Sequence, residues 1–300
     1  MDLSRLLGAA ANFNRSDENM TDSLIHSIES VTPTQTWLKA AKYLAQEEER
    51  MVFNLVLGVH QPTIVTAEDF HVHDVVNTFL EDHGKQPLVT TAGTIFPGGL
   101  YLQGGANAVF TEFPVLYKKF KTQWGTYAGR MFCPTITSKG KERAPLEALI
   151  EKLKAQADHG HMRAAYEVKI FDDGDIGNTC ELSTYEPESD CDMTRGQPCL
   201  THLSFKLHQD NSVSLTALYR THFYIEKTLG NLLGLGQLLS FVAEEAGLTA
   251  GSLVCHSTMA QLDTVANSDK NRGWNQDDID KLLQDCEAQY ANLKRNLVAV

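Results

Sequence analysis

Residues 228–247 place the strongest constraint on the fold, because this stretch is apolar on nearly all of its faces. Its sequence, TLGNLLGLGQLLSFVAEEAG, predicts a long helix that Asn231, Gln237, Glu244 and Glu245 interrupt with polar groups. A helix that is apolar all round is stable only when other elements cover it. Insertion in a membrane would require about 18 or more consecutive apolar residues, and this stretch has fewer. We therefore expect the helix to lie inside a water-soluble protein.

Strand-like segments precede and follow this helix. HLSFKLHQ (202–209) and SVSLTALYR (212–220) alternate apolar and polar residues, and the residues Asp210-Asn211 between them favour a hairpin turn. SLVCHSTMAQLD (252–263) is a third strand-like segment. Strands and a buried helix that share one core are typical of an α/β (α+β) protein.

The rest of the chain shows further helical and strand patterns. No linker composition or low-complexity block interrupts it, so we expect an N-terminal extension at residues 1–32 and a single domain at residues 33–300. Apolar residues at helical spacing predict helices, and β-rich runs predict strands. The expected elements are helices at 36–50, 73–84, 145–163 and from 277 onward, and strands at 51–59 and 164–172.

Charge and cysteine content exclude several classes of protein. The net charge of −12 argues against a broad surface for nucleic acid or for an anionic membrane, although a pocket for one phosphate remains compatible with it. The six cysteines have no paired spacing and the first residues do not form a signal peptide, which favours free thiols in the cytoplasm. His71 and His73 are two residues apart, but no further ligands are recognised, so polar histidines are favoured over a metal site.

Residues 120–265 resemble the thymidylate synthase and pyrimidine hydroxymethylase family, most clearly from residue 197 onward. Pro198-Cys199 matches the nucleophile loop of that family, and the apolar helix matches its long buried helix. The segment WGTYAGR is similar to the one that supplies the active-site tyrosine, here Tyr127. The resemblance implies a mixed sheet flanked by helices, and a homodimer that forms through the face of the sheet.

The resemblance also implies a covalent mechanism. Cys199 would be the thiolate that adds to carbon 6 of a uracil ring, which makes carbon 5 a nucleophile towards a one-carbon electrophile. An ordinary thiol, with a pKa of about 8.5, is largely protonated at neutral pH, so a nearby arginine is expected to favour the thiolate. Arg220 stands in the place of the family's phosphate-binding arginine and is expected to serve both purposes. Thr221 is expected to contact the same phosphate.

Other residues are implied in substrate binding. Asn231 falls where the family has its pyrimidine-reading asparagine, whereas cytosine-specific relatives carry an aspartate there, so a uridine nucleotide is expected. Arg163 matches an arginine that reaches the neighbouring subunit's site, which implies a homodimer with shared sites. Gln261 and Asp263 stand where the family has a sugar-contacting His-x-Tyr pair. Arg195, in an acidic surface loop, is a further candidate for the phosphate.

Three positions concern the cofactor, which the resemblance implies to be 5,10-methylenetetrahydrofolate. Phe223 replaces the family's aspartate three residues beyond the phosphate arginine, a carboxylate that helps to hold the folate. The family's early catalytic glutamate has no match that we can place in the sequence, and Gly93 stands near its expected position. The C-terminal Val298-Ala299-Val300 resembles the short tail that closes the folate site.

The leading interpretation is a transferase that adds a methyl or hydroxymethyl group to carbon 5 of dUMP or UMP through a Cys199 adduct. A second interpretation, supported by Phe223, is a relative that has lost this chemistry and binds a nucleotide for sensing or regulation. A third is a thiol hydrolase in which Cys199 pairs with His202, His208 or His222.

Overall fold

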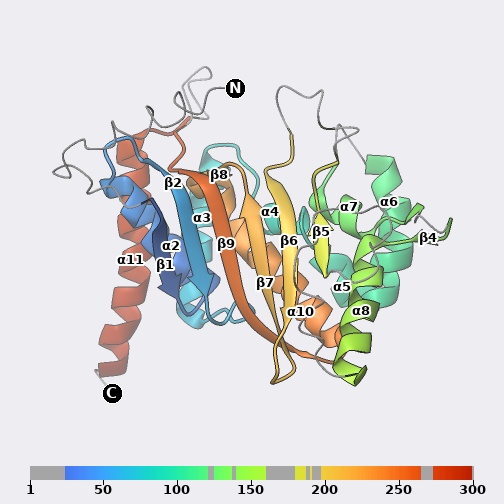
Figure 1. Ribbon diagram of the computed structural model, residues 1–300. Helices are drawn as coiled ribbons and strands as arrows, with labels where there is room; N and C mark the ends of the chain where they lie inside the picture. Colours follow the sequence, from blue (N-terminus) through green and yellow to red (C-terminus); the bar gives the residue numbers. More distant parts are fainter. Residues whose placement is uncertain are drawn as a thin grey trace, which may run out of the picture.

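The protein is built on one mixed sheet with helices on one of its faces (Figure 1). The computed structural model describes residues 24–120, 125–136, 140–159, 180–186, 190, 197–264 and 273–298. The strands of the main sheet are β1 (His26–Ser30), β2 (Met51–Val59), β5 (Glu181–Ser183), β6 (Leu200–Leu207), β7 (Ser212–Tyr219), β8 (His222–Phe223) and β9 (Thr249–Gln261), and a separate short pair is formed by β3 (Thr135–Ile136) and β4 (Glu142–Arg143).

The helices account for most of the remaining described chain. Two of them, η2 and η4, have π-helical hydrogen bonding and each leads into a longer helical segment. The helices are α2 (Pro33–Gln46), α3 (Ala67–Asp82), α4 (Leu88–Gly93), α5 (Gly98–Asn107), η2 (Ala108–Glu112), α6 (Phe113–Phe120), α7 (Tyr127–Phe132), α8 (Pro145–His159), η4 (Tyr224–Thr228), α10 (Leu229–Ala246) and α11 (Gln276–Val298).

Strand β9 is the centre of the sheet, whose order is β1-β2-β9-β7-β6-β5. It pairs antiparallel with β2 and parallel with β7, and the short β8 extends its parallel pairing. The outer strands add a parallel pair, β1 with β2, and two antiparallel pairs, β6 with β7 and β5 with β6. The mixed sheet expected from the sequence is therefore confirmed.

Helix α10 covers the sheet on the face behind the strands in Figure 1. It is the helix predicted from residues 228–247, and all but a few of its residues are buried. Its glycines allow close approach to the neighbouring backbone: a Cβ atom added to Gly236 would lie 2.1 Å from the carbonyl oxygen of Pro62, and one added to Gly234 would lie 2.7 Å from that of Ala92. Gly247 ends the helix in a left-handed conformation (φ 71°), which glycine adopts without strain.

Strand β9 shows how the two faces of the sheet differ. Leu253, Cys255 and Ser257 are fully buried beneath the helices, whereas Val254 and His256 between them are only partly buried. This alternation is that of a strand with one face on the core and one face open. The open face is the one that Figure 1 presents to the viewer, and no helix of the described chain covers its centre.

Several elements begin or end where the sequence did not indicate. Residues 26–30 were assigned to an extension but form β1, which extends the sheet beyond β2. Helix α3 begins at Ala67, earlier than the predicted 73, because Thr66 and Asp69 cap its N-terminus with reciprocal hydrogen bonds. Strand β5 lies within the predicted surface loop 172–196. The strand predicted at 164–172 lies outside the described residues.

The apolar character of α10 reflects burial in protein. Among the described residues, no helix combines the length and the hydrophobicity needed to cross a membrane.

Candidate functional site

Cys199 and Tyr127 meet at the N-terminal end of β6. Tyr127 is the first residue of α7, and its side chain is 8% exposed. Its hydroxyl oxygen accepts hydrogen bonds from the backbone N–H groups of Cys199 (3.0 Å) and Leu200 (3.2 Å). The tyrosine therefore holds both of the peptide groups that flank the α-carbon of Cys199.

Arg220 joins this pair from the end of β7, the strand that pairs with β6. Its backbone N–H donates to the carbonyl oxygen of Cys199 (3.0 Å), and its guanidinium hydrogen-bonds the thiol. The guanidinium also donates to the side-chain oxygen of Gln197 and to its carbonyl oxygen (3.2 Å). Tyr127 and Arg220, which the sequence placed in one site with Cys199, thus both contact Cys199 directly.

The thiol of Cys199 is held mainly in its protonated form in this environment. Burial raises its pKa above that of an ordinary thiol, and the charge and hydrogen bond of Arg220 lower it by less than burial raises it. Arg220 acts in the expected direction, but it does not by itself produce a thiolate at neutral pH. Burial also raises the pKa of Tyr127 to about 12, so this hydroxyl is neutral.

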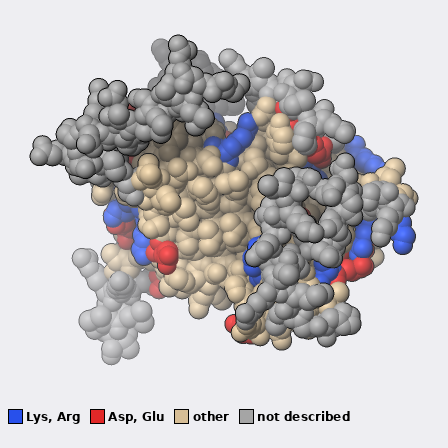
Figure 2. Space-filling model, in the orientation of Figure 1, with Lys and Arg blue, Asp and Glu red and all other residues tan. Residues whose placement is uncertain are grey.

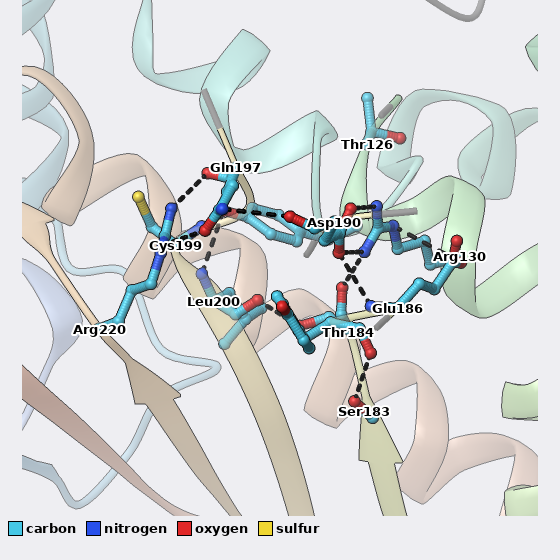
Figure 3. Close-up of polar contacts among 12 residues, drawn as sticks. Thr126, Arg130, Ser183, Thr184, Glu186, Asp190, Gln197, Cys199, Leu200 and Arg220 are labelled. Carbon is cyan, nitrogen blue, oxygen red and sulfur yellow. Dashed lines mark hydrogen bonds and ion pairs between the residues drawn. The ribbon is translucent and has the colours of Figure 1, made fainter. Parts of the chain in front are cut away.

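A buried ion pair between Arg130 and Asp190 lies next to Gln197, two residues before Cys199. The guanidinium of Arg130, on α7, donates to both carboxylate oxygens of Asp190 (2.6 and 2.8 Å), and Asp190 is fully buried (Figure 3). The carbonyl oxygen of Asp190 accepts from the side chain of Gln197 (3.1 Å). Arg130 and Gln197 therefore connect α7 to the nucleophile loop, a link that sequence reasoning missed.

Asn231 lies in the first turn of α10 and is 6% exposed. Its side-chain nitrogen lies 3.0 Å from Nε2 of His222, whose other ring nitrogen lies 3.0 Å from the hydroxyl of Ser257. The ring of His222 stacks on Tyr219 with centroids 4.0 Å apart. Sequence reasoning assigned Asn231 to the site but missed its contact with His222; the separation of nine residues across β8 and η4 gave no pattern to indicate it.

The two residues matched to the sugar-contacting pair differ in their surroundings. Gln261 ends β9, where it pairs with Phe223 of β8. Asp263 is buried, and its two carboxylate oxygens accept from the backbone N–H groups of Ile225 (2.7 Å) and Glu226 (3.2 Å). Asp263 therefore holds the start of η4, and both of its oxygens already have partners.

The remaining predicted residues fall into two groups. Thr221 is half-buried in the turn between β7 and β8, directly after Arg220. Arg163 and Arg195 lie outside the described residues, as do two of the three residues of the predicted C-terminal tail.

The histidines considered for a thiol hydrolase have other hydrogen-bond partners. His202 bonds Glu181 (2.6 Å), His208 bonds Ser214 (2.8 Å), and His222 bonds Ser257 and Asn231. These contacts do not favour a Cys–His pair. Among the described residues, no group of three or more His, Cys, Asp or Glu side chains is placed to hold a metal ion.

Position 223, where the resemblance led us to expect a carboxylate for folate, holds a phenylalanine. Phe223 stands at that position with its side chain 39% exposed, and a phenyl ring offers no acceptor to a pterin. The nearby Glu226 forms ion pairs with Lys85 (3.0 Å) and Lys227 (2.8 Å). Position 223 thus differs from the aspartate that the resemblance led us to expect there for holding folate.

Comparison with known proteins gives one partial similarity. A segment of 65 residues is 37% identical to a protein of Methanococcoides burtonii named "Putative thymidylate synthase". The matched segment covers 22% of this chain and 30% of that relative's length. No family model matches the chain.

Proposed function

We propose that this protein transfers a one-carbon unit to carbon 5 of a pyrimidine nucleotide through a covalent adduct with Cys199. The observation that carries the proposal is the convergence of Cys199, Tyr127 and Arg220 at one end of β6 and β7. The partial similarity to a protein named as a thymidylate synthase supports the same chemistry. The nucleotide proposed is dUMP or UMP, and the product is a methyl or hydroxymethyl derivative.

The proposed chemistry begins at the sulfur. Cys199 loses its proton to solvent and its sulfur forms a bond with carbon 6, while the electrons of the carbon 5–carbon 6 double bond move to carbon 5 and the oxygen on carbon 4. Carbon 5 then bonds to the one-carbon electrophile, and the electrons of its carbon–nitrogen double bond move to nitrogen. The hydrogen on carbon 5 leaves as a proton and the amine is expelled from the new methylene group. Addition of water to that exocyclic methylene would give the hydroxymethyl product, whereas the methyl product would require a hydride from a reduced donor of the tetrahydrofolate class; expulsion of the thiolate then restores the double bond.

The protein's own residues have distinct parts in this scheme. Arg220 and Thr221 anchor the phosphate, because a guanidinium binds phosphate oxygens in a bidentate manner. The guanidinium bond to the side chain of Gln197 is the one that a phosphate would replace. Asn231 reads the base and Gln261 the sugar. Arg163 and Arg195 are proposed as further phosphate contacts.

The resemblance proposes 5,10-methylenetetrahydrofolate as the one-carbon donor. Since Phe223 stands where a carboxylate would hold it, donor binding is tested separately from nucleotide binding.

We also propose that two copies associate through the open face of the sheet. Val56, His256 and Leu218 lie in register across β2, β9 and β7 on this face, and Phe53 on β2 is 61% exposed. Figure 2 shows the centre of the face without Lys, Arg, Asp or Glu side chains. An uncharged sheet face with exposed apolar side chains such as Phe53 is a candidate surface for a partner. Light scattering after chromatography should give a dimer mass, and Val254→Glu should reduce it to that of a monomer.

Incubation with 5-fluoro-dUMP tests the chemistry directly, because fluorine replaces the carbon 5 hydrogen that must leave as a proton once the one-carbon unit is attached, so the adduct is trapped at that stage. Intact-protein mass spectrometry should detect a stable adduct in the parent protein and in Cys133→Ala, a matched control that removes another partly buried thiol. The adduct should be absent from Cys199→Ala. Repeating the incubation with and without methylenetetrahydrofolate shows whether the donor is required.

The alternative function is nucleotide binding without chemistry, for sensing or regulation. It is favoured by Phe223 at the position of the folate carboxylate and by burial, which keeps the Cys199 thiol protonated. Reversible binding of 5-fluoro-dUMP with no adduct, and no tritium release from nucleotide labelled at carbon 5, would support this alternative and refute the transferase.

A further inference from the structure

Among the described residues, His222 is the side chain that hydrogen-bonds the carboxamide of Asn231, the group proposed to read the base. It lies on β8, is 2% exposed, and its Nε2 is 3.0 Å from the carboxamide nitrogen of Asn231. Its flat stacking on Tyr219, with an angle of 3° between the rings, fixes the plane of the imidazole. The position of each ring nitrogen is therefore defined by the packing.

The hydrogen bonds around this ring determine which nitrogen carries the proton. Burial lowers the pKa of His222 to about 3, so the ring is neutral and has one donor and one acceptor. The carboxamide nitrogen of Asn231 can only donate, so Nε2 accepts from it and Nδ1–H donates to the Ser257 oxygen (3.0 Å). The Ser257 hydroxyl can in turn donate to the hydroxyl oxygen of Tyr224 (3.3 Å). In this arrangement each of these hydrogen bonds pairs one donor with one acceptor.

We propose that His222 locks the carboxamide of Asn231 in the orientation that reads uracil and thereby makes the site select uridine over cytidine nucleotides. The inference rests on the function proposed above. With one N–H directed to His222, the remaining edge of the carboxamide presents its oxygen and its second N–H together. Uracil offers the matching N3–H donor and carbon-4 oxygen acceptor, whereas cytosine offers the reverse pair.

Rotation of the carboxamide by half a turn would let an asparagine read cytosine instead. In this protein the rotated oxygen of Asn231 would face the acceptor nitrogen of His222, and two acceptors in a buried site repel each other. His222 is thus a positioning residue that acts on the base through Asn231.

The same group of side chains connects to the thiol. Tyr219, which stacks on His222, is fully buried, and its hydroxyl has no hydrogen-bond partner among the described residues. Burial raises the pKa of Tyr219 well above its ordinary value, and the nearby Tyr127 and Cys199 raise it further. The base-reading group and the nucleophile therefore share one buried neighbour.

The first test examines the free protein. In protein with ¹⁵N-labelled histidine, long-range ¹H–¹⁵N correlation spectra distinguish the two neutral tautomers, and His222→Gln identifies the signal. We expect the proton of His222 on Nδ1. A proton on Nε2 would mean that the ring donates to Asn231, which would overturn the inference without any nucleotide being added.

The second test measures binding of dUMP, UMP, dCMP and CMP by titration calorimetry. His222→Phe keeps a ring against Tyr219 but removes the acceptor, so its preference for uridine nucleotides should fall about tenfold, the factor that one neutral hydrogen bond is worth. His222→Gln can either accept from or donate to the carboxamide of Asn231, so its preference should fall between those of the parent protein and His222→Phe. Unchanged selectivity in folded His222→Phe would refute this inference alone, whereas failure of the parent protein to bind any of the four nucleotides would also refute the proposed function.

Discussion

Replacement of Tyr127 by phenylalanine tests whether its hydroxyl organises the nucleophile loop. The hydroxyl oxygen accepts from two backbone amides, those of Cys199 and Leu200, and Leu200 is fully buried. Phenylalanine keeps the ring but leaves both amides without this acceptor. A buried donor without a partner costs about 1–3 kcal/mol, and the partly buried amide of Cys199 costs less because water can reach it. We expect a total loss of about 2 kcal/mol.

The matched control is Tyr219→Phe. Tyr219 is also fully buried, but its hydroxyl has no hydrogen-bond partner in the described part of the chain. Removal of that hydroxyl should leave the free energy of unfolding unchanged or raise it by up to about 1 kcal/mol. The two variants remove the same atom from the same residue type at neighbouring positions, so their difference isolates the two amide hydrogen bonds.

Urea denaturation followed by circular dichroism measures both variants. Since unfolding of a chain of this length has an entropy of roughly 0.6 kcal/mol per kelvin, a loss of about 2 kcal/mol should also lower the melting temperature by about 3 °C. The rate at which Cys199 is alkylated should rise in Tyr127→Phe, because the backbone around the thiol loses its two hydrogen bonds to the hydroxyl. If Tyr127→Phe costs no more than Tyr219→Phe, the role assigned to the Tyr127 hydroxyl is wrong.

Three further predictions follow from burial and close packing. Burial raises the pKa of Cys199 above that of an ordinary thiol, so the rate at which iodoacetamide alkylates it should still be rising at pH 9.0, and a plateau below about pH 8 would contradict this. At a given pH below 9.0, Arg220→Met should react more slowly than the parent protein, because Arg220 favours the thiolate. Burial raises the pKa of Asp263 from 3.8 to about 6, so its contribution to stability is present below 3.8 and is lost as pH rises through 6. The difference in unfolding free energy between the parent protein and Asp263→Asn should therefore fall by about 3 kcal/mol over that range, and a difference independent of pH would contradict this. Gly236→Ala should lower the free energy of unfolding by about 3 kcal/mol, because the added methyl group would meet the backbone of Pro62. Gly99→Ala, whose methyl group would point into open space, should leave it unchanged, and equal melting temperatures of the two variants would contradict this packing.

The local sequence pattern was sufficient to predict those elements whose signal lies in their own residues. Strand β2 has the predicted bounds of 51–59, and the hairpin between β6 and β7 turns at Asp210-Asn211, where Asn211 adopts a positive φ of 60°. The apolar helix was predicted because its composition alone demands burial. In each case neighbouring residues carry the signal.

Other features depend on contacts between distant parts of the chain, which no short window contains. Strand β1 is too short to show alternation and is a strand because β2 lies beside it. The resemblance placed Cys199, Tyr127 and Arg220 together, and the structure brings them into contact. It did not indicate Arg130 with Asp190, or His222 with Asn231, because these pairs belong to this chain's own packing. Asp263 was assigned to substrate, but its geometry holds η4.

The place of β9 has a consequence for how the protein is made. Among the described strands it is the last in the sequence, and it alone pairs with β2 on one side and with β7 on the other. While the ribosome is still synthesising residues before 249, the two groups of strands have unsatisfied edges and no strand pairing between them. Completion of the fold must wait for this late segment, and until then the nascent chain has exposed edges that invite aggregation or chaperone binding.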